Sequence, residues 1–164
     1  MKALRWFLAW LAAVLVTAAL GSIVQTQINL ARIAELGVSV SLSERLETTL
    51  ADLFGFAPLW AIIVAAGLLV ALLVADGISR RWPFSTTGLH VLAGFLAPVV
   101  ALLVMDAMLP VTAIAAARTW SGVFLIGLPG AVGGWIYLRQ FTQRQKGQTF
   151  HQAAQRNSSS HDGS

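Results

Sequence analysis

The chain has 164 residues, of which 57% are hydrophobic and 11% are charged, and its formal net charge is +4 at pH 7. Soluble domains carry about 25% charged residues. A chain with so few charges and a mean hydropathy of +0.73 cannot cover a water-facing surface, so its composition indicates a membrane protein. The absence of cysteine excludes disulfides, thiolate metal sites and cysteine nucleophiles.

Four segments are apolar enough to cross a bilayer, which takes about 20 residues in a helix. They cover residues 6–24, 58–76, 88–109 and 118–138. The sequence therefore predicts an all-α fold, a bundle of four transmembrane helices within residues 1–139. Residues 140–164 are polar and basic and hold too little apolar surface to offset the entropy of ordering, so we expect a disordered cytoplasmic tail.

Basic residues gather on one side of this arrangement. They precede the first span, separate the second from the third and follow the fourth: Lys2, Arg5, Arg80, Arg81, Arg139, Arg144, Lys146 and Arg156. The loop between the first two spans is acidic instead. The positive-inside rule then predicts that both termini lie in the cytoplasm, and we expect a multi-pass protein of the cell inner (plasma) membrane. The first segment has the basic start of a signal peptide, but Thr17-Ala18-Ala19 is a poor cleavage site, so we expect it to stay as a span.

Residues 25–55 are predicted to form an amphipathic helical hairpin on the periplasmic side. The first helix should stop at Gly37, which tolerates a left-handed backbone. Ser41 and Glu44 form a capping-box pattern, which should open a short helix. Its apolar stripe consists of Leu42, Leu46, Leu50 and Leu53. We expect this helix to end at Gly55 and the next to carry Pro58 in its first turn.

Small residues at helical spacing predict close contacts between helices, although Ala and Gly are common in such segments. The sets are Gly67, Ala71 and Ala75; Ala93, Ala97 and Ala101; Gly127 with Ala131; and Gly130 with Gly134. Pro98 and Pro129 should kink the third and fourth helices. We expect fixed structural bends there; the alternative is a cavity between two kinked neighbours.

Ionisable residues in or near spans are the first candidates for a functional site. Asp106 and Arg118 should lie just under the outer interface and pair, while Gln25 and Asn29 share a face of the first helix. With Arg32, these residues form a candidate periplasmic polar pocket roofed by residues 42–54. The alternative is a solvated helix end with a structural ion pair.

A second group lies at the inner edge. Asp76 and Arg80 are four residues apart in the favourable order for a helical ion pair. His90 begins the third span and is placed to hydrogen-bond Asp76 or to titrate near neutral pH. The simpler interpretation of all three is an anchor for the helix ends.

Standard catalytic patterns are missing, so we expect neither an enzyme nor a metal or cofactor site. His151 and His161 lie in the tail, which leaves His90 without a second histidine for metal or haem. Trp120-Ser121-Gly122 shares only Ser-Gly with intramembrane serine proteases. The basic tail has too few aromatic residues for nucleic-acid binding and better suits anionic lipid head groups.

Several stretches resemble a group of small, uncharacterised bacterial four-helix membrane proteins. They are Gln25 to Leu30, Leu36-Gly37-Val38, Arg45 to Leu50 and Gly55 to Leu59. The helical hairpin after the first span also resembles DoxX-type membrane proteins in layout. The resemblance implies a four-helix fold and no particular activity.

The leading hypothesis from the sequence is a non-enzymatic accessory or scaffold protein that engages lipid or a membrane partner through its outer hairpin. One alternative is a small-molecule or lipid-binding or transport protein that acts as a homo-oligomer. A membrane redox subunit is the third.

Overall fold

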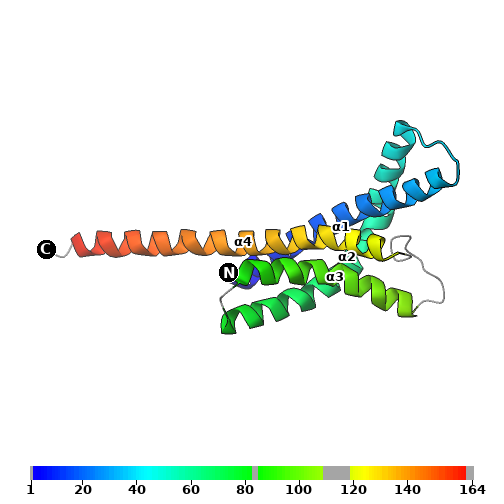
Figure 1. Ribbon diagram of the computed structural model, residues 1–164. Coiled ribbons are helices and arrows are strands. Elements are labelled where there is room, and N and C mark those ends of the chain that lie inside the picture. The colour runs from blue at the N-terminus through cyan, green and yellow to red at the C-terminus, as the bar shows by residue number, and fades with distance from the viewer. Residues whose placement is uncertain (1, 83–84, 109–118, 162–164) are drawn as a thin grey trace.

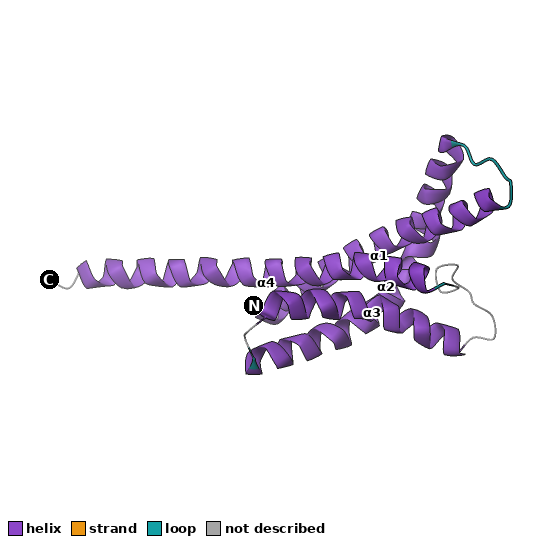
Figure 2. Cartoon of the chain, viewed as in Figure 1, coloured by secondary structure: helices purple, strands orange, loops and turns teal. Residues whose placement is uncertain are grey.

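The computed structural model describes residues 2–82, 85–108 and 119–161, with side chains from residue 3 to residue 140 within those ranges. Four helices make up this part of the chain: α1 (Lys2–Glu35), α2 (Leu42–Arg81), α3 (Thr86–Met108) and α4 (Trp120–His161). No strand occurs among these residues, as Figure 2 shows. All four helices are long and apolar enough to cross a membrane. The predicted all-α fold, with four helices long and apolar enough to span a membrane, is confirmed for this part of the chain.

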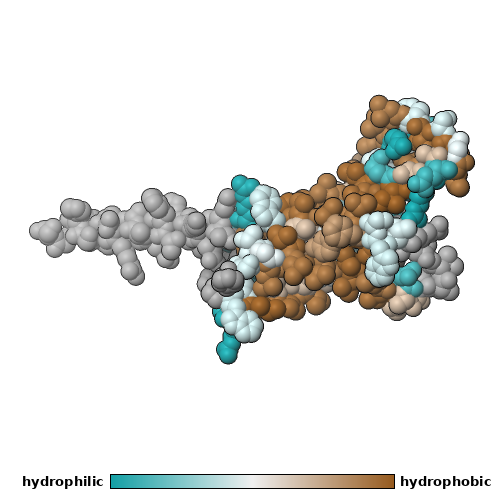
Figure 3. Space-filling model, in the orientation of Figure 1, coloured by the Kyte–Doolittle hydropathy of each residue, from teal (hydrophilic) through white to brown (hydrophobic). Residues whose placement is uncertain are grey.

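The helices run alternately up and down (Figure 1). We call the end that holds the start of α1, the end of α2 and the start of α3 the inner end, and the opposite end the outer end. Each helix packs on two others, because α1 contacts α2 and α4, and α3 also contacts α2 and α4. Figure 3 shows an apolar band around the middle of the bundle, with polar residues at both ends of it. This distribution is what a bilayer requires of a spanning bundle.

The outer connection between α1 and α2 follows the predicted chemistry. Gly37 has a φ of +88°, the left-handed conformation that suits glycine after a helix. Ser41 caps α2, and its side chain and that of Glu44 bond reciprocally to the backbone in a capping box. The end of α1 and the start of α2 therefore form a helical hairpin, which projects from the rest of the bundle in Figure 1.

The predicted break at Gly55 is wrong. The chain runs through Gly55 and Pro58 as one helix of 40 residues. Gly55 keeps a negative φ and so cannot form a left-handed cap. A proline within a helix removes one backbone hydrogen bond and bends the helix without necessarily ending it, and α2 changes direction along its length in Figure 1.

α4 is also longer than its predicted span. It continues past residue 139 to His161, through residues for which the composition predicts disorder. The Gln, Arg, Lys and Ala residues of this segment have high helix propensity, which a prediction from low hydrophobicity does not weigh. The division into a bundle and a tail remains a prediction.

Small residues bring the helix backbones together. A β-carbon at Gly94 of α3 would overlap backbone atoms of Gly130 and Gly134 in α4. A β-carbon at Gly67 of α2 would lie 3.2 Å from the carbonyl oxygen of Ala97 in α3. The predicted internal contacts of Gly67, Ala97, Gly130 and Gly134 are confirmed, whereas the contact of Gly94 with Gly130 and Gly134 was not predicted.

The proline of α3 belongs to the same contact. Pro98 is buried, and a β-carbon at Gly130 would lie 2.7 Å from its ring. The Pro98 ring therefore packs against α4, and a fixed bend at this position stays a prediction.

Candidate functional site

Four side chains, one from each helix, meet at the inner end: Trp6 of α1, Asp76 of α2, His90 of α3 and Tyr137 of α4. We call them the inner junction. Oδ1 of Asp76 lies 2.8 Å from Nε2 of His90, and the Tyr137 hydroxyl donates to Oδ2 over 2.6 Å. The Trp6 side chain lies beside the Asp76 carboxylate. The Asp76 carboxylate therefore joins α2, α3 and α4 through hydrogen bonds.

The histidine ring is held on every side. Its Nδ1 lies 2.7 Å from the carbonyl oxygen of Thr86, one turn earlier in α3. The ring stacks on Tyr137 with centroids 5.7 Å apart and an interplanar angle of 16°. His90 is 1% exposed and Tyr137 is fully buried, while the Asp76 side chain is 16% exposed. Water reaches the junction mainly through Asp76.

The glycine contact between α3 and α4 explains why these side chains meet. A β-carbon at Gly134 would overlap the backbone carbonyl of His90, so only glycine lets α4 approach the first turns of α3. Tyr137 lies three residues after Gly134 and so shares its face of α4. On α2, the buried Leu68 and Leu72 precede Asp76 at intervals of four, which points the carboxylate into the bundle.

The sequence placed Asp76 and His90 within hydrogen-bonding reach, and the structure brings them together. It does not pair Asp76 with Arg80, which is exposed and makes no ion pair with Asp76 in the described part of the chain. Tyr137 was missed as a site residue. The available signals were that it is the only tyrosine in the chain and that it lies one turn from the predicted packing glycine, Gly134.

A second polar cluster joins α1 and α2 in the hairpin. Oγ1 of Thr26 lies 2.7 Å from Oδ2 of Asp52 and 2.9 Å from the Ser22 carbonyl oxygen, so its single proton goes to one of these acceptors. Gln27 donates to Thr49 Oγ1 and accepts from Arg45, both over 3.2 Å. Thr49 in turn donates to the Arg45 carbonyl over 2.6 Å.

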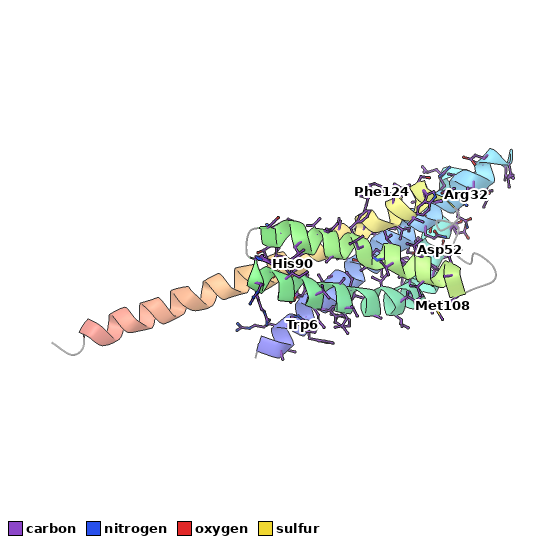
Figure 4. The ribbon with its side chains drawn as sticks, turned by 60° about the horizontal axis from the view of Figure 1, so that its bottom comes forward. Trp6, Arg32, Asp52, His90, Met108 and Phe124 are labelled. Atoms are coloured by element: carbon purple, nitrogen blue, oxygen red, sulfur yellow. The ribbon has the colours of Figure 1, made fainter. Side chains whose placement is uncertain are left out.

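The structure places the five residues of the predicted outer pocket as follows. Gln25 is half-buried and Asn29 is exposed, both on α1, and Asp106 is exposed in the last turn of α3. Arg32 donates to Thr119 over 3.2 Å and lines a hollow of about 380 Å³ between α1 and α4, together with Glu35. Arg118 lies outside the described residues. Figure 4 shows Arg32 and Asp52 at the outer end, opposite Trp6 and His90.

In the hairpin segment of α2, the polar face packs against α1 and the apolar face is exposed. Its polar side chains Arg45, Thr49 and Asp52 bond to α1, as described above, while its leucines point away from the protein. Leu42, Leu46 and Leu50 are 74%, 59% and 56% exposed, and Phe54 is 79% exposed. The fourth predicted stripe residue, Leu53, is half-buried. A helix that packs on a water-soluble protein shows the opposite arrangement.

Comparison with known protein families, with characterised proteins and with solved structures gives no match for this chain. The chemistry of the site therefore rests on its own geometry. The inner junction offers a hydrogen-bonded network of a carboxylate, a histidine and a tyrosine, and the outer hairpin offers an exposed apolar surface.

Proposed function

We propose that the protein is a non-enzymatic scaffold or accessory protein of the bacterial inner membrane, which binds an apolar helix of another membrane protein through its outer hairpin. The contact surface consists of Leu42, Leu46, Leu50 and Phe54, which we call the hairpin apolar face. The single observation that carries the proposal is that the polar side of this segment is used internally while its apolar side is exposed.

The length of α3 and the direction of the hairpin support a position of this face at the outer edge of the hydrocarbon core. At about 1.5 Å per residue, the 23 residues of α3 extend about 35 Å, which already crosses a core of about 30 Å. α2 has 40 residues and changes direction along its length, so its hairpin segment projects to the side of the bundle at the outer end (Figure 1). Exposed leucines at that level are unfavourable in water, and a partner surface that covers them removes the cost.

The orientation in the membrane is supported by the charge distribution. Arg5, Arg80, Arg81 and Arg139 all lie toward the inner end, whereas Glu44 and Glu47 lie on the hairpin. The positive-inside rule then places the inner end and both termini in the cytoplasm and the hairpin in the periplasm.

Site-specific photo-crosslinking tests the proposal. A photoreactive residue is introduced at Leu46 or Leu50, with Glu47 on the adjacent face as the matched control position, and cells are irradiated before purification. We expect one defined protein adduct, stoichiometric in native mass spectrometry, from positions 46 and 50 and a weaker one from 47. Adducts to lipid alone, or equal adducts at all three positions, would contradict it.

A second candidate function, lipid binding, is favoured by the hollow between α1 and α4. Arg32 and Glu35 present opposite charges at its edge, beside the hydroxyl of Thr119, and Ile28 and Leu125 line its apolar part. Opposite charges above an apolar wall suit a zwitterionic phospholipid head group. Native mass spectrometry should then retain phosphatidylethanolamine in the purified protein and lose it in Arg32→Gln; equal retention by both would exclude this site.

A further inference from the structure

The hydrogen bonds of His90 determine where its protons are. The carbonyl oxygen of Thr86 can only accept, so Nδ1 at 2.7 Å carries a proton. On the other side of the ring, Nε2 faces Oδ1 of Asp76 at 2.8 Å. The second carboxylate oxygen already accepts from Tyr137. A contact between Nε2 and Oδ1 at this distance requires one proton between them.

We propose that Asp76 and His90 form a buried proton-binding site, in which one exchangeable proton is shared between Oδ1 and Nε2. Placed on Nε2, the proton gives a histidinium paired with a carboxylate; placed on Oδ1, it gives a neutral acid and a neutral ring. Both forms have zero net charge and satisfy every hydrogen bond of the pair. This inference does not depend on the function of the hairpin.

Both the loss of the shared proton and the gain of a second proton disrupt the hydrogen bonds or the charge balance of the Asp76–His90 pair. Loss of the shared proton leaves the Nε2 lone pair facing a carboxylate, which is repulsive at 2.8 Å. Gain of a second proton leaves a buried net positive charge without a counter-ion. Since Asp76, His90 and Tyr137 come from three different helices, the packing of the inner end then depends on the proton.

Among the described side chains, those around the pair add positive charge and no further carboxylate. The charged side chains nearest this end are Arg5 on α1, Arg80 and Arg81 on α2, and Arg139 on α4, whose guanidinium lies 5.0 Å from the centroid of the Trp135 ring. The described inner half of α3 adds no charged group besides His90. Asp76 is the more exposed member of the pair, so the proton exchanges with the aqueous phase at the inner end through its carboxylate.

Nitrogen-15 NMR of the histidine ring tests the proton position directly. The full chain with His151→Asn and His161→Asn leaves His90 as the one histidine, and it is studied in lipid nanodiscs near pH 7. We expect a protonated Nδ1 at all times. Asp76→Asn should move the Nε2 resonance to the chemical shift of an unprotonated nitrogen that accepts a hydrogen bond, because the amide N–H of Asn takes the place of the shared proton. An unprotonated Nδ1 in the parent protein would overturn the proposal.

The pH dependence of stability provides a second readout. As the pH rises above about 6.5, the usual pKa of histidine, the unfolding midpoint of the parent protein should fall because the shared proton is lost. Asp76→Asn should remove this fall, because its amide donates to Nε2 and its carbonyl still accepts from Tyr137. Tyr137→Phe should lower the midpoint and keep the fall, since the proton pair is intact. Identical pH profiles for the parent and Asp76→Asn would overturn the proposal; if Asp76→Asn does not fold, the Nδ1 result in the parent decides.

Discussion

Gly94 of α3 and Gly130 of α4 meet backbone to backbone, because a β-carbon added at either residue would overlap the carbonyl oxygen of the other. Lipid provides no hydrophobic force that draws helices together, so this close approach is a main source of contact energy between α3 and α4. It also positions the inner junction, since Gly134 belongs to the same contact and Tyr137 follows it.

Gly94→Ala should therefore separate α3 from α4. Overpacking of a tight contact typically costs about 1–3 kcal/mol, and backbone atoms on the other side cannot move away as a flexible side chain would. Thermal unfolding in detergent measures the loss. Gly77→Ala is the matched control, because a β-carbon there meets nothing within 4 Å. It should be neutral or stabilise by up to about 1 kcal/mol through helix propensity. Equal midpoints for the two variants would contradict the tight contact.

Thr26→Val should loosen the hairpin without disturbing the rest of the bundle. The substitution keeps the shape of the side chain but removes the hydroxyl that contacts Asp52, at a cost of about 1 kcal/mol. Hydrogen exchange should become faster in residues 22–54 and stay unchanged in α3. Thr48→Val, on the same helix segment and without a described hydrogen bond to α1, is the control. Faster exchange throughout the protein would contradict this, because it would show that the Thr26 hydroxyl stabilises the whole fold.

Leu46→Ser should weaken partner binding through the hairpin apolar face while the bundle stays folded. Leu46 is 59% exposed, so its loss creates no cavity in the protein. A fully buried leucine contributes about 1.5–3 kcal/mol to a contact, which corresponds to a roughly 10- to 100-fold weaker complex. Co-purification of the crosslinked partner provides the measurement, and Leu73→Ser, an exposed position on the spanning part of α2, provides the control. Unchanged co-purification with Leu46→Ser would contradict the proposed surface.

The sequence was sufficient for the features that depend on local chemistry. Hydropathy predicted the four spans, the Ser41–Glu44 pair predicted the capping box, and Gly37 predicted the end of α1. It failed at Gly55 because a glycine ends a helix only when its backbone takes the left-handed conformation, and that depends on where the following residues pack.

Tertiary features were harder to predict. The contact between Asp76 and His90 was within reach of the sequence, because both lie at the ends of consecutive helices. Tyr137 was not, because its place depends on the rotation of α4, which the contact between Gly94 and Gly130 sets. Likewise, the hairpin leucines are exposed because Thr26 and Gln27 of α1 hydrogen-bond the polar face of α2. The residue pattern of one helix alone does not predict hydrogen bonds to another helix.

The central claim is that the hairpin and the inner junction lie on opposite sides of one membrane. The chain has no cysteine, so single-cysteine variants report one position each. Ser43 on the hairpin and Ser85 at the start of α3 are both exposed and suit this test. In intact spheroplasts, a membrane-impermeant maleimide should label Ser43→Cys at once and Ser85→Cys only after the membrane is permeabilised. Labelling of both variants from the same side would contradict the four-span arrangement.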